Sequence, residues 1–263
     1  AISSGLVGSE MCIRDRHKRG FNRPMCRLVK ALYGHPESGG HWERHLTSVI
    51  KKHLHGCSIE AHPSSFWIES RKLVLTVYVD DLLLSGPAEF HETFWRELGR
   101  HVKIDPYEPL GRFIGRNHDV LEQTNSGRVV ALAMCDFAQD AVDQYSKLTG
   151  ITNFRKAATP FCPDGSLAPE GECQRGELHT PACAVLMKNL WLARLARPDI
   201  QKPIGDLATH IQQWSVNDDK RLHRLICYIN STKGHRLVGK VGDKPADLKL
   251  RLYVDADFAG DSD

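Results

Sequence analysis

The sequence predicts an α+β fold. Strand-like apolar runs and helical periodicities are interleaved along the 263 residues, without the regular strand–helix–strand rhythm of a parallel sheet. Apolar residues make up 41% and charged residues 25% of the chain, as in ordinary globular proteins. Because no apolar run approaches the length of a membrane span, we expect no membrane partner.

Residues 1–16, AISSGLVGSEMCIRDR, differ from the basic segment that follows them. The string LVGSEMCIRD resembles a translated sequencing-library adapter of the transposase-end kind. Such segments are set aside before the fold is considered. We therefore expect residues 1–16 to be non-native and the true coding sequence upstream of about His17 to be missing. A natural, flexible N-terminus is the alternative.

The first half of the chain predicts a helix, three strands and a second helix. The first helix carries apolar residues at helical spacing and ends at Gly56. Next, FWIES and LVLTVY predict two strands joined at residues 70–72, VDD a tight turn and LLLS a third strand. Pro87 suits the start of the second helix. Its apolar positions follow at i, i+4 and i+8: Phe90, Phe94 and Leu98.

The second half predicts a strand pair, four helices and two closing strands. LGRFIGRNH and RVVALAM form the pair, and Asp136 is expected to cap the helix that follows. ATPFCPDGSLAPEGE is typical of a linker. Three helices are predicted from Pro181, after Pro203 and from Asn217, a suitable cap. HRLVGKV and LKLRLYVDADF predict the closing strands.

Charge and cysteine content narrow the class of protein. Residues 17–55 hold eight Lys or Arg against two acids, and residues 220–240 hold six bases and no acid. Two basic segments in a chain of net charge +3 favour an anionic partner such as nucleic acid. Two solvated faces are the alternative. The eight cysteines show no CxxC spacing and no secretory signal is present, so we expect an intracellular, reducing setting.

The run LTVYVDDLLLSG, residues 75–86, places Asp80 and Asp81 between two apolar segments. Charged side chains are rarely buried without a partner or a metal. A tight turn here would lift both carboxylates to the rim of a sheet. Hard oxygen ligands on a rigid hairpin suit Mg²⁺ or Mn²⁺, and paired ions of this type promote phosphoryl transfer. An ordinary polar turn is the alternative, since Asp is common in turns.

Five motifs occur in order between about Met25 and Asp263: KALYG, YVDD, LGRFIGR, NLWLARLARPDI and LYVDADFAGD. Together they resemble the reverse transcriptase of copia-type retrotransposon polyproteins, and the last is similar to the opening strand of the RNase H domain that follows it. The resemblance implies an RNA-directed DNA polymerase that extends an RNA or DNA template–primer with dNTPs by two-metal nucleotidyl transfer. An unrelated metal-dependent phosphotransferase would need all five motifs to arise by chance.

The resemblance also implies a fold and a division of the chain. The fold is a partial right-hand polymerase, with a palm hairpin and fingers and thumb helices, followed by a helical connection and the start of an RNase H-like domain. The predicted parts are an adapter-derived segment, a fingers–palm–thumb fragment, a helical thumb or connection region and a truncated RNase H start: 1–16, 17–165, 166–240 and 241–263.

Site residues carry over position by position. The resemblance implies that Asp80 is a catalytic metal-binding carboxylate and that its neighbour Asp81 contributes to metal binding or to the field of the site. Tyr78 and Val79 would lie beside the primer end. Asp255 matches the first metal-binding aspartate of the RNase H domain.

The KALYG motif implies contacts near the incoming nucleotide and template. Lys30, Tyr33 and Gly34 keep the family pattern there. The family's usual Leu-Lys-Gln continuation is replaced by His-Pro-Glu at residues 35–37, so a direct nucleotide contact by that triplet is not expected.

The family also has an Asp on an earlier palm strand. The segment HKRGFNRPM before KALYG contains no acid, and Asp15 lies in the adapter-like segment. We therefore expect a fragment with little or no polymerase activity, from a parent that also carries an integrase and a complete RNase H domain. The alternative is a decayed or co-opted remnant that binds nucleic acid without catalysis, or does nothing.

Overall fold

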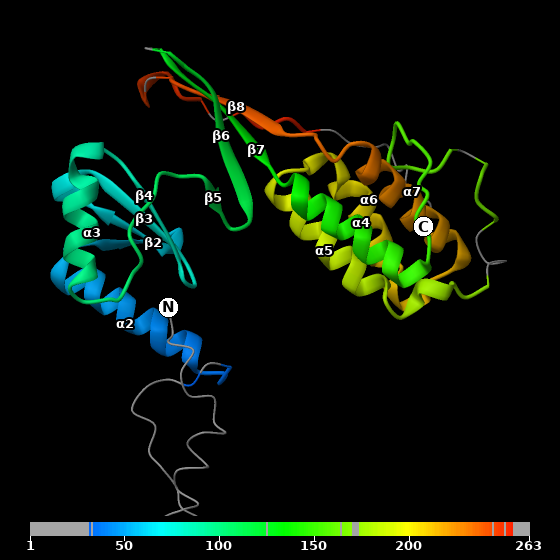
Figure 1. Cartoon of the computed structure of the whole chain (residues 1–263), viewed down its shortest axis with the longest axis horizontal. Coiled ribbons are helices and arrows are strands. Elements are labelled where there is room, and N and C mark those ends of the chain that lie inside the picture. The colour runs from blue at the N-terminus through cyan, green and yellow to red at the C-terminus, as the bar shows by residue number, and fades with distance from the viewer. Residues whose placement is uncertain are drawn as a thin grey trace, which may run out of the picture. The chain divides into compact units, whose positions relative to one another are not determined.

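The computed structural model describes residues 32, 34–124, 126–163, 165–169, 174–243, 245–249 and 251–254. The chain divides into two units between Leu110 and Gly111. Each unit contains one antiparallel four-stranded sheet and α-helices, which confirms the predicted α+β class (Figure 1). The division falls inside the segment predicted as fingers, palm and thumb, and the predicted family domains remain predictions.

The first unit is a sheet covered on one face by two helices (Figure 1). The predicted helices and strands are all present, with one further strand between α2 and β2. Their bounds are α2 Ser38–His53, β1 Cys57–Ile59, β2 His62–Ile68, β3 Leu73–Tyr78, β4 Asp81–Ser85 and α3 His91–Gly99, and the strand order is β1-β2-β3-β4.

Period-two alternation along β3 decides which face of this sheet is buried. Leu73 and Leu75 are fully buried, whereas Val74 and Thr76 are only partly covered on the other face. Ile50 of α2 and Phe94 of α3 complete the core beneath the sheet. Burying each such side chain contributes about 1.5–3 kcal/mol, so the core holds the β3–β4 hairpin in place.

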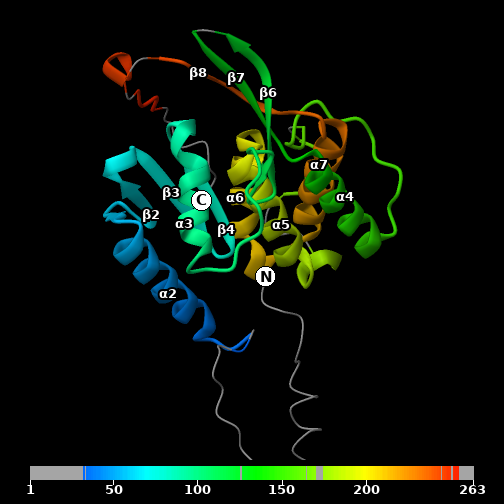
Figure 2. The same cartoon turned by 60° about the vertical axis from the view of Figure 1, so that its left-hand side comes forward.

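Four helices form the core of the second unit. They are α4 Cys135–Thr149, α5 Ala182–Leu195, α6 Gln201–Thr209 and α7 Val216–Ser231. α4 and α6 each pack against both α5 and α7, and Figure 2 shows the four together. All four helices were predicted, α4 from apolar spacing and the other three from residues typical of helix ends.

Two predicted helix caps were wrong. Asp136 lies in the first turn of α4, whose N-cap is Met134. The N-cap of α7 is Ser215, whose side chain accepts from the backbone N–H of Asp218 while the Asp218 carboxylate accepts from the Ser215 N–H. Asn217 is instead buried and exchanges two hydrogen bonds with the backbone of Ala168, so its amide holds a distant loop.

The second sheet joins segments from both ends of this unit. Its strands are β5 Arg112–Phe113, β6 Arg116–Thr124, β7 Gly127–Ala133 and β8 Leu237–Val241, in the order β5-β6-β7-β8. β8, the predicted HRLVGKV strand, pairs antiparallel with β7, and Leu237 lies opposite Leu132.

The second predicted closing strand is absent among the described residues 248, 249 and 251–254. Leu252 is 86% exposed and forms no strand pair. Apolar alternation alone does not hold a strand, because its backbone N–H and C=O groups need a ladder partner. Asp255 lies outside the described residues. Within the described part of the chain, no helix has the length and apolar character needed to span a membrane.

Candidate active site

The β3–β4 hairpin ends in a two-residue turn. Val77 pairs with Leu82 and Tyr78 pairs with Asp81, which leaves Val79 and Asp80 as the connecting residues. Val79 adopts a φ of 55°. Two-residue hairpins require positive φ at the first central position, where glycine or asparagine is usual, and a β-branched residue there is a backbone outlier. The turn therefore places Asp80 at the tip and carries strain at Val79.

A side chain from α2 holds this turn. The indole Nε1 of Trp42 donates a hydrogen bond of 2.6 Å to the carbonyl oxygen of Val79. Trp42 also packs against the core under the sheet. One residue thus couples the packed helix to the backbone beside the two aspartates.

Both carboxylates of the hairpin are exposed to solvent. Asp80 is in the turn, and Asp81 begins β4 opposite Tyr78. Adjacent exposed carboxylates are hard, anionic oxygen donors, which Mg²⁺ accepts together with water and substrate phosphates. The donor set therefore fits a divalent cation. Across the described residues, no three or more His, Cys, Asp or Glu side chains gather into a metal-binding group.

The structure brings four of the predicted site residues together. Tyr78, Val79, Asp80 and Asp81 share the hairpin tip. Gly34 has a φ of 86° in the turn before α2, a conformation that favours glycine. Three further predicted residues lie outside the described residues: Lys30, Tyr33 and Asp255.

The LGRFIGR motif forms a second hairpin with a tight turn. Phe113 pairs with Arg116, which leaves Ile114 and Gly115 as a two-residue connection with φ of 54° and 77°. Positive φ at both positions matches the twist that a hairpin requires, again with a β-branched residue at the first. Its predicted role in supporting the primer strand remains a prediction.

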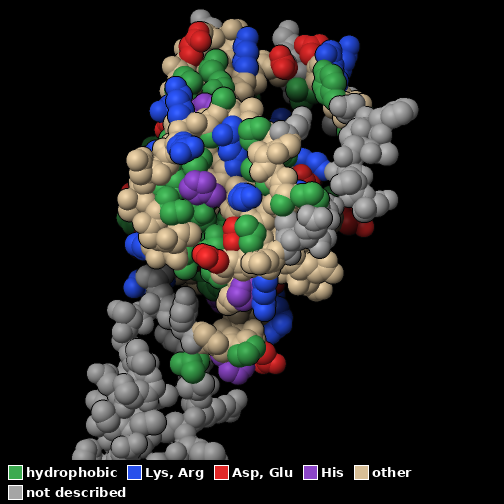
Figure 3. Space-filling model, turned by 90° about the vertical axis from the view of Figure 1, so that its right-hand side faces the viewer, with side chains coloured by type: hydrophobic (Ala, Val, Ile, Leu, Met, Phe, Trp, Pro, Cys, Tyr) green, Lys and Arg blue, Asp and Glu red, His purple; other side chains and the backbone are tan. Residues whose placement is uncertain are grey.

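The basic residues between 220 and 240 are largely engaged within their own unit. Arg224 donates to the carbonyl of Thr159 at 3.0 Å, and Arg236 lies 3.7 Å from Asp119. Arg221 and Lys233 contact Asp218 and Gln139. Figure 3 shows basic side chains mixed with hydrophobic and acidic ones over one face. Fewer of these cations are therefore unengaged than the sequence suggests, which weakens the prediction that this segment binds a nucleic acid.

The Arg-Pro-Asp-Ile segment forms an ion pair around a buried arginine. Arg197 is 3% exposed and donates to Asp199 at 2.7 Å and to the carbonyl of Thr232 at 2.9 Å. Tyr228 donates its hydroxyl to the same carboxylate at 2.9 Å. Burial opposes ionisation of Asp199, but hydrogen bonds from Arg197 and Tyr228 outweigh it and lower its pKa. The motif thus ties the start of α6 to the end of α7.

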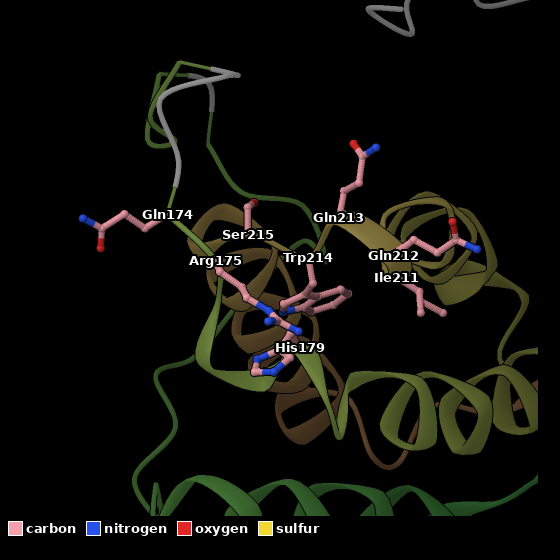
Figure 4. A pocket seen from close by; sticks show the side chains of 8 residues that line it. All are labelled: Gln174, Arg175, His179, Ile211, Gln212, Gln213, Trp214 and Ser215. Carbon is pink, nitrogen blue, oxygen red and sulfur yellow. The ribbon is translucent and has the colours of Figure 1, made fainter.

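A cavity of about 280 Å³ lies in the second unit, and none of its lining residues is a predicted site residue. Figure 4 shows the side chains of Arg175, His179 and Trp214 among those that line it. Trp214 itself donates to Asp219 at 2.7 Å. The lining residues are Gln174, Arg175, His179, Ile211, Gln212, Gln213, Trp214 and Ser215.

Two adjacent carboxylates on a hairpin are oxygen donors of the kind that a divalent cation accepts. Comparison with known proteins gives the family. Residues 16–163 match the model of the family described as "Reverse transcriptase (RNA-dependent DNA polymerase)". The match covers more than half of the chain, so the chain belongs to this family.

Relatives with assigned names place it among copia-type retrotransposon polyproteins, as predicted. A Saccharomyces cerevisiae protein named for the transposon Ty5-1 is 23% identical over 87% of this chain and 71% of its own length. Pol polyproteins of the transposons RE1 and RE2 from Arabidopsis thaliana are 25% and 24% identical over 91% of this chain. The chain spans 16% of each Arabidopsis polyprotein. No solved structure matches it.

Sequence reasoning missed the contribution of Trp42. Its spacing with Leu46 and Val49 is that of an ordinary core position on α2, and nothing local distinguishes its indole N–H. The hydrogen bond to Val79 arises only when the helix packs beneath the hairpin.

Proposed function

We propose that Asp80 and Asp81 bind Mg²⁺ or Mn²⁺ in the polymerase site of this reverse transcriptase. The supporting observation is the hairpin tip, where both carboxylates are exposed on a turn held by Trp42. Asp80 provides the principal metal-binding carboxylate. Asp81 provides a second oxygen donor or contributes negative charge to the electrostatic field of the site. Tyr78 lies beside the primer end, with Val79 shaping the turn. When bound, such ions activate the primer hydroxyl and neutralise charge on the transferred phosphate.

A third carboxylate is needed for a second ion, and we propose that it is supplied on a strand beside β4. Among the described strands, β4 pairs only with β3, so its other edge is open to a further strand. Residues 17–33 contain no acid. A polypeptide of only these 263 residues is therefore expected to show little or no polymerase activity.

Metal binding and primer extension test these statements separately. Mn²⁺ titration monitored by electron paramagnetic resonance should show a site that is weakened at least tenfold in Asp80→Asn and unchanged in Asp105→Asn, an exposed control in the same unit. Unchanged Mn²⁺ affinity in Asp80→Asn would remove the metal assignment. Mg²⁺-dependent extension of a template–primer by the 263-residue chain, lost in Asp80→Asn, would refute the inactive-fragment proposal.

The second candidate is a decayed or co-opted remnant that binds nucleic acid without catalysis. It is favoured by the lack of a three-ligand metal cluster among the described residues. The reading frame of the source locus discriminates between the two. Stops or frameshifts around this segment indicate a remnant, whereas an uninterrupted frame with a palm Asp, an integrase and a complete RNase H domain indicates a working polymerase.

We also propose the partners and setting of the parent protein. Its substrates are dNTPs and an RNA or DNA template–primer, and it works inside the cell, in the cytoplasm or nucleus. Asp255 begins the RNase H metal site, and Lys30, Tyr33 and Gly34 lie near the incoming nucleotide. Sequencing across the locus also tests the adapter origin of residues 1–16, which genomic sequence running in frame through Arg16 into His17 would refute.

A further inference from the structure

The face of the first sheet that α2 and α3 leave uncovered carries two aromatic side chains and one of the carboxylates. We call it the open face. The register of β2–β4 assigns alternate residues to it, because paired residues share a face. Its members are Ser65, Trp67, Val74, Thr76, Tyr78, Asp81, Leu83 and Ser85.

Trp67 and Tyr78 are the large aromatic residues of the open face. Trp67 is 36% exposed and Tyr78 is 44% exposed, whereas Phe66 and Ile68 beside Trp67 are buried on the helix side. Trp67 lies opposite Val74, and Tyr78 is four residues further along β3. At about 3.3 Å per residue, Trp67 and Tyr78 are therefore separated by roughly 13 Å along the strand direction.

The chemistry of the open face matches bases better than phosphates. Its strand residues include no Lys or Arg, and Asp81 is its one charged side chain among them. A phosphate backbone requires cations, whereas the face of a nucleobase stacks on an aromatic ring and needs none. Because Asp81 lies on this same face, a nucleic acid strand that reaches the carboxylates can extend over Trp67.

We infer that the open face is a stacking surface for unpaired bases of a single-stranded nucleic acid, with Trp67 as its anchor. The inference rests on the proposed function, since it takes the occupant of the neighbouring carboxylate site to be a nucleic acid. It assigns a binding role to Trp67 that the carboxylate pair does not require.

The test measures binding of a fluorescein-labelled 12-nucleotide oligo(dT) to the full chain without metal or dNTP. High salt suppresses the backbone contribution, so stacking dominates the affinity. Trp67→Ala should weaken binding roughly 5- to 150-fold, the range for loss of one stacked base. Trp67→Phe should retain most of the affinity. Phe161→Ala is the control, because Phe161 is an exposed aromatic outside the first sheet.

Tryptophan fluorescence gives a second readout that does not depend on how well Trp67→Ala folds. Oligo(dT) should quench the emission of the unmodified chain, and the quenching should be largely lost in Trp67→Phe. Equal affinity and equal quenching in the variants would overturn the inference, as would a chain that binds no oligonucleotide.

Other occupants of the open face give different outcomes. If a second copy or another part of this chain covers it, Trp67→Ala leaves oligonucleotide affinity unchanged and alters the sedimentation coefficient or the unfolding temperature, which overturns the inference. Mn²⁺ binding measured in parallel reports on Asp80 and Asp81. Trp67-dependent binding without an Mn²⁺ site would remove the proposed function alone, and an Mn²⁺ site without Trp67-dependent binding would remove the stacking surface alone.

Discussion

The indole of Trp42 donates a hydrogen bond of 2.6 Å to the backbone carbonyl of Val79, across 37 positions of sequence. Val79 is the residue of the hairpin turn with positive φ, immediately before Asp80. The contact therefore joins a core helix to the most strained point of the candidate site.

Removing this hydrogen bond should loosen the turn. We expect Trp42→Phe, which keeps a ring but loses the N–H donor, to lower the free energy of unfolding by about 0.5–1.5 kcal/mol. Hydrogen exchange at the turn amides should also accelerate. Urea denaturation and exchange measured by mass spectrometry check both effects. Trp95→Phe is the control for loss of indole volume, since Trp95 packs against the same core. Equal hydrogen exchange at the turn in both variants would contradict the conclusion that the Trp42 hydrogen bond holds the turn.

Glycine should relieve the backbone strain at Val79. A left-handed conformation costs a non-glycine residue about 1–2 kcal/mol. Glycine avoids this cost, but it loses more chain entropy on folding, which destabilises the folded state by about 0.5–1 kcal/mol. Val79→Gly should therefore leave the free energy of unfolding unchanged or raise it by up to about 1.5 kcal/mol. Val74→Gly, in the extended part of the same strand, should lower it by about 1 kcal/mol or more. Equal losses for both variants in urea denaturation would show that Val79 is unstrained.

The ion pair of the Arg-Pro-Asp-Ile segment should be important for stability. Asp199→Asn removes the charged acceptor of the buried Arg197 guanidinium, but the Asp199 side chain is itself 37% exposed, so we expect a loss of about 1.5–3 kcal/mol. Asp206→Asn is the control, because Asp206 pairs with Lys202 at the surface and should cost less than about 1 kcal/mol. Thermal and urea denaturation measure the free energy of unfolding of both variants. Similar small losses in the two would mean that the ion pair of Arg197 contributes little to stability.

His223 should make the second unit less stable in mild acid. Burial, assisted by the nearby charge of Arg155, lowers the pKa of His223 below its usual 6.5. The unfolded chain then takes up a proton first, so stability falls as the pH drops from 7 through 6.5 toward the lowered folded-state pKa. The unfolding free energy measured between pH 7 and 5 should fall less steeply in His223→Gln. His62→Gln, at an exposed position, should keep the original slope.

Local patterns were sufficient for most elements of this fold. Apolar spacing predicts α2, α3 and α4, residues typical of helix ends predict α5–α7, and two flanking apolar runs around VDD predict the β3–β4 hairpin. The caps of α4 and α7 were misjudged because Asp136 and Asn217 are both plausible caps by residue type. Only the hydrogen bonds of Ser215 with Asp218 decide where α7 begins.

By itself, the sequence determined the family, the order of its elements and the placement of Asp80 and Asp81 at a tight hairpin, although the structure assigns Asp81 to β4 rather than to the turn. Those features depend on residues a few positions apart, whose preferences act without the rest of the chain. Tertiary structure decided the hydrogen bond of Trp42 to Val79, the pairing of β8 with β7 and the face that Trp67 shares with Asp81. Each depends on segments far apart in sequence, which meet only because burying their apolar faces together offsets the entropy of bringing them into contact.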